Sequence, residues 1–321
     1  MEDKDTTTPA SEPPGGQETT TYIVEPTTKH THTIILLHGL GSNGAKFGQE
    51  LLATGRTSAG TSLAELLPGA RFVFPTAKRR RSSAFGRTKL MQWFDIARLA
   101  DPSYRKETQL EGLAESAGAI RALLCREAAQ VAPGNIILGG ISQGCATSLS
   151  VLLSLEYPLG GYVGMCGYLP FREDVEREIE EPGGDGWGGG GDGDDVFAAS
   201  DEDDLFERPD DKNRPLQEPA LRAFHFERDL LCLDALPDAT LDQTAALTPI
   251  FLGHGDADEK KPYELGEAAA RTMRAAGYSV EWKLYGGLGH WYKIPDEIDD
   301  IAKFICEDVG WESILVNFTS G

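Results

Sequence analysis

Short, continuous apolar runs recur along the chain, and most are bounded by glycine, proline or charged residues. The clearest is Thr31–Leu37, which ends at His38-Gly39. Runs this short and rich in β-branched residues are typical of strands covered on both faces of a sheet. On this basis strands are predicted over 31–37, 70–74, 135–138, 161–166 and 249–252, and an alternating pattern predicts one more over 279–285.

Longer stretches between these runs carry apolar side chains at helical spacing. In Leu110–Val131, residues such as Leu113 and Ile120 fall on one face, and Pro133-Gly134 ends the pattern. Helices are predicted over 110–131, from 143 to about 155, and over 263–275 and 295–309. Strands that alternate with helices predict the α/β class, with a mostly parallel central sheet and helices on both faces.

Two acidic segments interrupt this pattern. Residues 1–20 carry a net charge of −4 and residues 172–215 carry −12, out of −21 for all 321 residues. The second segment contains a glycine-rich stretch over 183–193 followed by Asp and Glu runs. Neither segment has enough apolar surface to offset the entropy lost on ordering. We therefore expect one domain over 21–321, with a disordered tail over 1–20 and a disordered low-complexity insertion over 172–215.

Composition excludes several classes of protein. The acidic balance argues against nucleic acid as a partner, and the five dispersed cysteines form no CxxC pair, which argues against a disulfide framework or a structural zinc site. The first residues lack a secretory pattern, and no apolar run reaches the ~18–20 residues of a membrane span. We expect a cytoplasmic protein that makes at most transient contact with a membrane surface.

One basic cluster, Lys78-Arg79-Arg80-Arg81, leaves alternatives open. It could act as a nuclear signal, which would add the nucleus to the expected locations, or bind anionic lipid head groups or the acidic insertion. A solvated charge cluster on a loop is the interpretation we favour, because runs of like charge are most often exposed.

The strongest chemical signal is Gly140-Ile141-Ser142-Gln143-Gly144, a G-x-S-x-G placed between a predicted strand and a predicted helix. A tight turn there lifts a serine hydroxyl above the carboxyl edge of the sheet. The first turn of the helix then offers free N–H groups to a developing oxyanion. Ser142 is therefore the candidate nucleophile.

A serine nucleophile needs a base and an acid, which follow it in this order of motifs. His290 lies in a glycine-rich loop after the last predicted strand and is the best base, whereas His225 lies in the segment that follows the acidic insertion and is a poor candidate. Asp256 and Asp258 both follow the preceding strand, and the residues alone leave the choice between them open. With His254 their spacing also resembles a metal site, but the set is incomplete and no metal is expected.

The loop His38–Gly44 follows the first predicted strand, where a second oxyanion donor is expected. Backbone N–H groups of Leu40 and Gln143 would form the pair. The same loop reads G-x-G-x-x-G, but the next strand ends at Phe74-Pro75 instead of the acid that a dinucleotide site requires.

Taken together, the motifs resemble the acyl-protein thioesterase/carboxylesterase branch of the α/β-hydrolases. They occur in the order HGLG (38–41), WFD (93–95), GISQG (140–144), LP (169–170), HGDAD (254–258) and GLGH (287–290). The resemblance covers about 30–310 without the insertion. It implies an α/β-hydrolase fold, a triad of Ser142, His290 and Asp258, and no cofactor. Trp93 and Leu169 are expected at the substrate-binding wall.

Two departures from the family pattern stand out. Lys260-Lys261 replaces the usual apolar residue before Pro262, and the acidic insertion begins close to Leu169-Pro170, near the expected acyl pocket. The function we expect is a serine hydrolase that removes fatty acyl groups from protein cysteines. Alternatives are a carboxylesterase or lysophospholipase acting on small esters, and a non-catalytic binding protein whose insertion closes the pocket.

Overall fold

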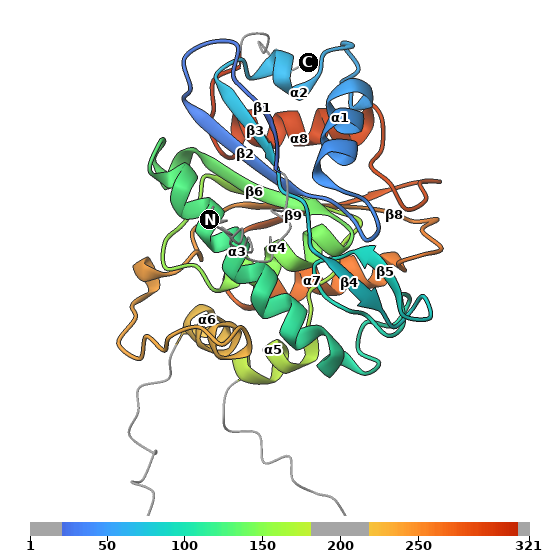
Figure 1. Cartoon of the computed structure of the whole chain (residues 1–321). Coiled ribbons are helices and arrows are strands. Elements are labelled where there is room, and N and C mark those ends of the chain that lie inside the picture. The colour runs from blue at the N-terminus through green and yellow to red at the C-terminus, as the bar shows by residue number, and fades with distance from the viewer. Residues whose placement is uncertain (1–20, 181–217, 314–321) are drawn as a thin grey trace, which may run out of the picture.

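A seven-stranded sheet forms the centre of the molecule, which is described here by a computed structural model covering residues 21–180 and 218–313 (Figure 1). The sheet is parallel except for its first strand, which pairs antiparallel with β3 at one edge. In spatial order the strands are β1 (Tyr22–Val24), β3 (Ala70–Phe74), β2 (His32–Leu37), β6 (Ile136–Ile141), β7 (Gly161–Met165), β8 (Ile250–Gly255) and β9 (Val280–Tyr285).

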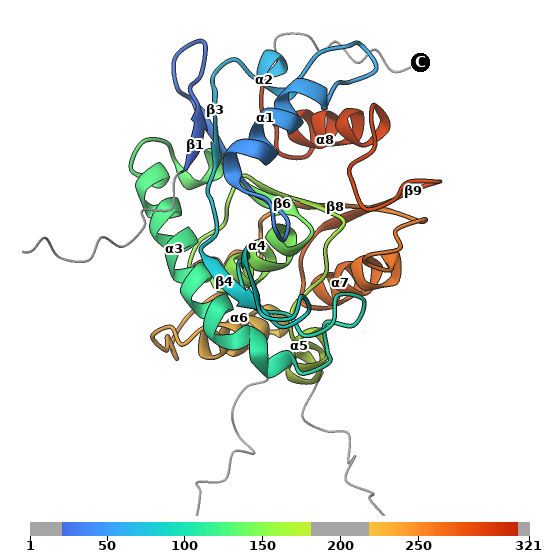
Figure 2. The same ribbon diagram turned by 45° about the vertical axis from the view of Figure 1, so that its right-hand side comes forward.

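Helices cover both faces of this sheet, as Figures 1 and 2 show. One face carries α1 (Gly44–Thr54), α2 (Leu63–Leu66) and α8 (Asp296–Glu307). The opposite face carries α3 (Leu110–Ala128), α4 (Gln143–Leu153), α5 (Arg172–Ile179), α6 (Pro219–Leu230) and α7 (Tyr263–Ala275). None of the helices among the described residues combines the length and apolar character needed to cross a membrane.

Two apolar cores result from this layering, one on each face of the sheet. Successive side chains of β2 alternate between them: Ile34 packs into one core and Ile35 into the other. Because side chains of a strand point to opposite faces in turn, a strand covered on both sides must be apolar at every position. The buried apolar run over residues 34–37 has this cause, and the predicted mostly parallel sheet with helices on both faces is confirmed.

The first part of the predicted insertion is folded, contrary to expectation. Residues Arg172–Ile179 form α5, in which Val175 and Ile179 are buried one helical turn apart. Charged residues fill the rest of this helix and pair with one another and with Lys106, so its high charge concealed an amphipathic helix. The predictions of disorder for 1–20 and 181–215 concern residues outside the described ranges.

Most of the basic cluster belongs to a small hairpin and not to a loop. Residues Arg79–Ser82 form β4, which pairs antiparallel with β5 (Thr88–Met91). Lys78 and Arg80 both form ion pairs with the carboxylate of Glu115 on α3. Lys78, Arg79 and Arg81 are exposed, as predicted for a solvated cluster, whereas Arg80 is half-buried, and the prediction of a loop is wrong for residues 79–81.

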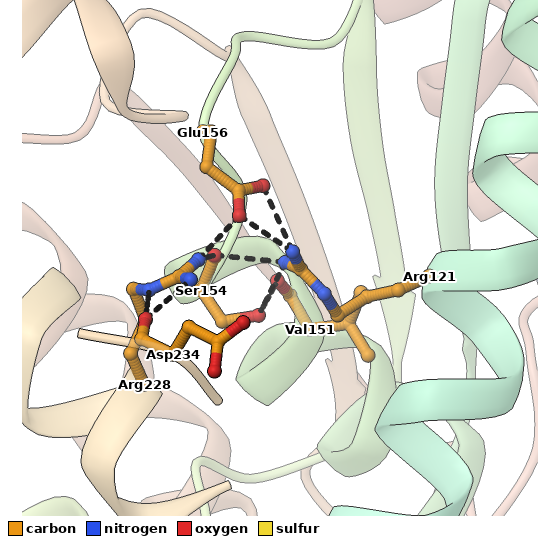
Figure 3. Close-up of polar contacts among 6 residues, drawn as sticks. All are labelled: Arg121, Val151, Ser154, Glu156, Arg228 and Asp234. Atoms are coloured by element: carbon orange, nitrogen blue, oxygen red, sulfur yellow. Dashed lines mark hydrogen bonds and ion pairs between the residues drawn. The ribbon is translucent and has the colours of Figure 1, made fainter. Parts of the chain in front are cut away.

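A shared carboxylate holds α6 against its neighbours (Figure 3). Arg121 of α3 binds both oxygens of Glu156, at 2.7 and 2.9 Å, and Arg228 of α6 binds one of them. Both guanidinium groups also donate to the carbonyl of Ser154, just after α4. Three segments distant in sequence are thus joined by charge-assisted hydrogen bonds, which are stronger than neutral ones.

Candidate active site

The loops at the carboxyl edge of the sheet bring the predicted site residues together, starting with a strained turn. Ser142 links β6 to α4 with a φ of 57° and a ψ of −119°, a conformation that side-chain-bearing residues rarely adopt. The turn is closely packed against β2: a Cβ at Gly140 or Gly144 would lie 2.6 or 2.2 Å from the carbonyl oxygen of Leu37. The two glycines of G-x-S-x-G are therefore required by this close approach.

Ser142, His290 and Asp258 form a continuous chain of hydrogen bonds. The Nε2 atom of His290 lies 2.9 Å from Ser142 Oγ, and its Nδ1 atom lies 2.6 Å from Asp258 Oδ2. Each residue follows the end of a different parallel strand, β6, β9 or β8, and these ends share one edge of the sheet. With Asp258 ionised, Nδ1 carries the proton and Nε2 is free to accept one from the serine.

The carboxylate of Asp258 is buried but saturated with donors. Its Oδ1 accepts backbone N–H groups of Lys260 and Lys261, both at 2.9 Å, and its Oδ2 faces His254 Nε2 at 3.2 Å as well as His290. Burial alone would raise the pKa of Asp258, but the hydrogen bonds from the two histidines and from Lys261 outweigh it and hold the pKa well below its usual range. The group therefore stays charged where it orients His290.

The structure separates the two aspartates that the residues alone could not distinguish. Asp256 is exposed and accepts the N–H of Gly287 through Oδ1 at 2.6 Å, so it supports the loop that carries His290. His254 is buried beside Asp258 and its Nε2 also lies 3.0 Å from the carbonyl of Lys261. His225 lies on α6, which packs on the helical layer and not at the carboxyl edge of the sheet.

The loop of the predicted oxyanion donors is fixed by a neutral histidine. Leu40 and Gln143 line one cavity together with Ser142, and Gln143 opens α4, where its N–H has no acceptor within the helix. The N–H of Ala77 donates to His38 Nε2 at 3.0 Å, which leaves the proton on Nδ1 to bind the carbonyl of Gly39 at 2.8 Å. Burial lowers the pKa of His38 to about 4, so the ring remains neutral and keeps this tautomer.

Trp93 supports this site from behind and does not line the cavity. Its backbone N–H binds Gln143 Oε1 at 3.0 Å, and its indole N–H binds the carbonyl of His38 at 2.8 Å. The side-chain amide of Gln143 donates from Nε2 to the carbonyl oxygen of Phe94 at 2.7 Å. In place of the expected substrate contact, the buried Trp93 joins the two loops predicted to supply the oxyanion donors, one through its backbone N–H and the other through its indole N–H.

A cavity of about 540 Å³ opens over Ser142. Its walls are mainly apolar, with two lysines on one side, and its lining residues are Gly39, Leu40, Ser42, Phe47, Phe85, Ile96, Leu99, Ile141, Ser142, Gln143, Tyr168, Lys260, Lys261, His290 and Trp291. Leu169, expected here, lies one residue beyond Tyr168 and lines a smaller neighbouring pocket of about 90 Å³. The volume and apolar walls of the larger cavity are typical of a small-molecule site.

Sequence reasoning missed most of this wall. Phe85 comes from the turn between β4 and β5, and Ile96 and Leu99 come from the irregular segment between the hairpin and α3; no periodic pattern marks an inward-facing side chain in either place. Tyr168 was also missed, although it directly precedes the Leu169-Pro170 pair that carries part of the family resemblance. The lysines stand out in the sequence only as a departure from the family pattern.

Comparisons with known proteins agree with this geometry. The sequence profile of the phospholipase/carboxylesterase family matches residues 18–182. Acyl-protein thioesterase 1 of Yarrowia lipolytica is 37% identical over 283 residues, covering 87% of this chain and 93% of that protein. Acyl-protein thioesterase 1 of Kluyveromyces lactis is 32% identical over 279 residues, covering 85% and 90%.

Among solved structures, the acyl-protein thioesterase 2 of Zea mays superposes with a TM-score of 0.58 and 25% identity, covering 91% of this chain and all of that one. SOBER1 of Arabidopsis thaliana, at 22% identity, shares the fold with a TM-score of 0.56. The resemblance predicted from the motifs is confirmed, and the chain belongs to the phospholipase/carboxylesterase family of α/β-hydrolases.

Proposed function

We propose that the protein is a serine hydrolase that removes fatty acyl groups from S-acylated protein cysteines. The observation that carries this proposal is the hydrogen-bonded chain Ser142–His290–Asp258 at the floor of an apolar cavity. The relatives named acyl-protein thioesterase, which align over most of the chain, support the thioester as the bond cleaved. No cofactor enters the reaction.

In the proposed reaction Ser142 Oγ attacks the thioester carbonyl while its proton passes to His290 Nε2. The N–H groups of Leu40 and Gln143 hold the oxyanion that forms, and Asp258 stabilises the imidazolium. The carbon–sulfur bond then breaks, and the departing thiolate takes the proton from His290. Water, activated by the same histidine, attacks the acyl-enzyme and releases the fatty acid.

The test is turnover of an S-palmitoylated peptide by the whole chain, with Ser142→Ala as the inactive variant. Removal of the nucleophile is expected to lower kcat by roughly 10⁶-fold, the loss typical of a serine triad. A fluorophosphonate probe should label the wild type and not the variant. Labelling that persists in Ser142→Ala would contradict the assignment of the nucleophile.

A parallel series of p-nitrophenyl esters of increasing chain length separates the two enzymatic alternatives. We expect the palmitoylated peptide to be the better substrate in kcat/KM. Rapid hydrolysis of short esters with no turnover of the peptide would instead identify a carboxylesterase of small substrates. Absence of any turnover by a protein with an intact triad would indicate a binding protein.

A further inference from the structure

A buried lysine lies in the wall of the apolar cavity over Ser142. Only 5% of Lys261 is exposed, and its ammonium donates to the carbonyl of Leu99 and lies 4.3 Å from the centroid of the Tyr168 ring. Leu99 and Tyr168 line the same cavity. Lys261 lines it too, so its ammonium, held by one carbonyl and one aromatic face, belongs to the wall of the space that an acyl chain would fill.

The backbone of this lysine is tied to the predicted triad. The N–H of Lys261 donates to Asp258 Oδ1 at 2.9 Å, and Asp258 in turn binds His290. Lys261 and Asp258, the acid of the predicted triad, thus lie on one short loop after β8. Its side chain then reaches across to the wall formed by Leu99, 162 residues away in sequence.

Charge in and around the cavity is unbalanced. Among the described residues that line it, two are lysines and none is an aspartate or glutamate. Two carboxylates lie near Lys261 outside the cavity: Asp258, which is saturated with donors, and Asp101, which is already bound to Ser103 and paired with Arg98 at 3.5 Å. A cation in an apolar wall without its own anion is unfavourable unless a ligand supplies one.

We propose that Lys261 forms an anion subsite in the acyl pocket, so that the enzyme favours acyl groups carrying a carboxylate distal to the reacting carbonyl. The proposal rests on the function above and adds a second class of acyl group to the fatty acyl groups named there: monothioesters of dicarboxylic acids. The distal carboxylate pairs with the ammonium, and Ser142 cleaves the carbon–sulfur bond at the other end. Water adds across that bond, so the products are the free diacid and the thiol.

The electrostatics of the site agree with this role. Burial lowers the pKa of Lys261 to about 7, and the nearby charges of Asp258 and Asp101 offset this only in part. A carboxylate placed beside the ammonium would favour its charged form. A wholly apolar chain of the same length would leave the ammonium buried without an anion.

The experiment compares pairs of thioesters that differ only at the distal end. Hexanoyl- and adipoyl-N-acetylcysteamine share the reacting carbonyl and an uncharged leaving group. The quantity measured is the ratio of kcat/KM for the adipoyl ester to that for the hexanoyl ester, which does not depend on the fraction of active enzyme. In the wild type we expect a ratio above one.

Lys261→Met, which keeps the length of the side chain and removes the charge, is expected to lower this ratio by about tenfold or more, as befits the loss of a hydrogen bond between charged groups. Lys261→Gln should lower it as well while keeping a donor for the carbonyl of Leu99, and it replaces the Met variant if that fails to fold. The matched control is Lys303→Met. It removes the same charge from an exposed lysine of α8, which is not among the lining residues of the cavity and where solvent screens the charge, and should leave the ratio near that of the wild type.

Each outcome decides the proposal. A wild-type ratio below one that neither Lys261 variant changes overturns the anion subsite and leaves the thioesterase intact. An equal fall of the ratio in Lys303→Met also overturns it, because the effect would then be one of general charge. If the wild type hydrolyses none of the three substrates, neither the two thioesters nor the palmitoylated peptide, the proposed function is overturned, and this inference with it.

Discussion

Two buried carboxyl groups in this molecule, Asp258 and Glu227, are in opposite states. Asp258 is surrounded by hydrogen-bond donors, and its pKa lies well below the usual range although burial opposes this. Glu227, on α6, is fully buried, and among the described residues neither of its oxygens has a hydrogen-bond partner that meets ordinary geometry. Burial raises its pKa to about 8, and the nearby hydroxyl of Ser150 offsets this only in part.

The comparison teaches that donors, and not depth, decide whether a buried carboxyl is charged. Glu156 sits between Arg121 and Arg228, and their hydrogen bonds lower its pKa even though burial would raise it. Glu297 is as buried as Glu227, receives one backbone N–H from Lys293, and has a pKa raised to about 8 by burial. Asp258 and Glu156 thus keep their charge, whereas Glu227 and Glu297 are mostly uncharged at neutral pH.

The largest expected effect removes the charge of Asp258. Asp258→Asn should lower kcat by about 10⁴-fold on a thioester substrate, because an amide neither orients His290 in the required tautomer nor stabilises its cation. The matched control is Asp256→Asn, two residues away and exposed, which keeps an acceptor for the N–H of Gly287. If Asp258→Asn lowered kcat less than tenfold, the charge kept on Asp258 would not be what the reaction requires.

Removing the carboxyl of Glu227 should stabilise the folded protein. Glu227→Met is expected to raise the free energy of unfolding by about 1–3 kcal/mol, because a buried polar group without a partner is replaced by an apolar one of similar size. Urea denaturation followed by circular dichroism measures this change. The exposed Glu264 on α7 provides the control, since Glu264→Met should change stability by less than about 0.5 kcal/mol. A clear destabilisation by Glu227→Met would show that Glu227 has a partner in solution.

The pH dependence of stability tests the same group without changing its size. The carboxyl of Glu227 has a pKa of about 8 in the folded chain against an ordinary value of 4.5, so between these values the folded state holds the extra proton. The free energy of unfolding therefore falls as pH rises through this window, by up to about 1.4 kcal/mol per pH unit for one such group. Glu227→Gln should flatten the fall between pH 5 and 8, with the contribution of Glu297 remaining. An unchanged slope would contradict the raised pKa.

The smallest effect on stability is expected at Glu156, the carboxylate shared by Arg121 and Arg228. Glu156→Gln should cost about 1 kcal/mol of stability, because Arg121 and Arg228 lose their shared charge but keep the carbonyl of Ser154. The exposed pair of Arg271 and Glu267 on α7 gives the comparison: Glu267→Gln should change stability by less than about 0.5 kcal/mol in the same denaturation assay. Equal effects at the two sites would show that burial adds nothing to the shared pair.

Much of the fold could be predicted because its central strands are covered on both faces. A continuous apolar run as short as Thr31–Leu37 is typical of a buried strand, and the helix predicted over 263–275 has the bounds observed for α7. The hairpin of β4 and β5 was not predicted. Its strands pair with each other outside the main sheet and bury little, so their sequences RRRS and TKLM show no alternation of apolar and polar residues. Helix α5 escaped because its two buried side chains are outnumbered by charges.

The candidate site was predictable to the extent that chemistry follows the ends of strands. Ser142 and His290 each follow a strand at the carboxyl edge, a position that motif order alone reveals. The choice of Asp258 over Asp256 needed the family resemblance, since both residues occupy the same turn. Contacts such as that of Lys261 with Leu99 join loops far apart in sequence, and no local pattern encodes them.

The packing of α5 against α6 has a practical consequence. Arg222 of α6 donates to the carbonyl of Ile179, so the chain leaves the described fold at residue 180 and re-enters it at 218 from two helices in direct contact. Cutting the chain between these points would yield two fragments with complementary apolar faces, one bearing Ser142 and the other Asp258 and His290. Hydrolysis would then occur only when the halves recombine, and the protein would serve as a split reporter of its own assembly.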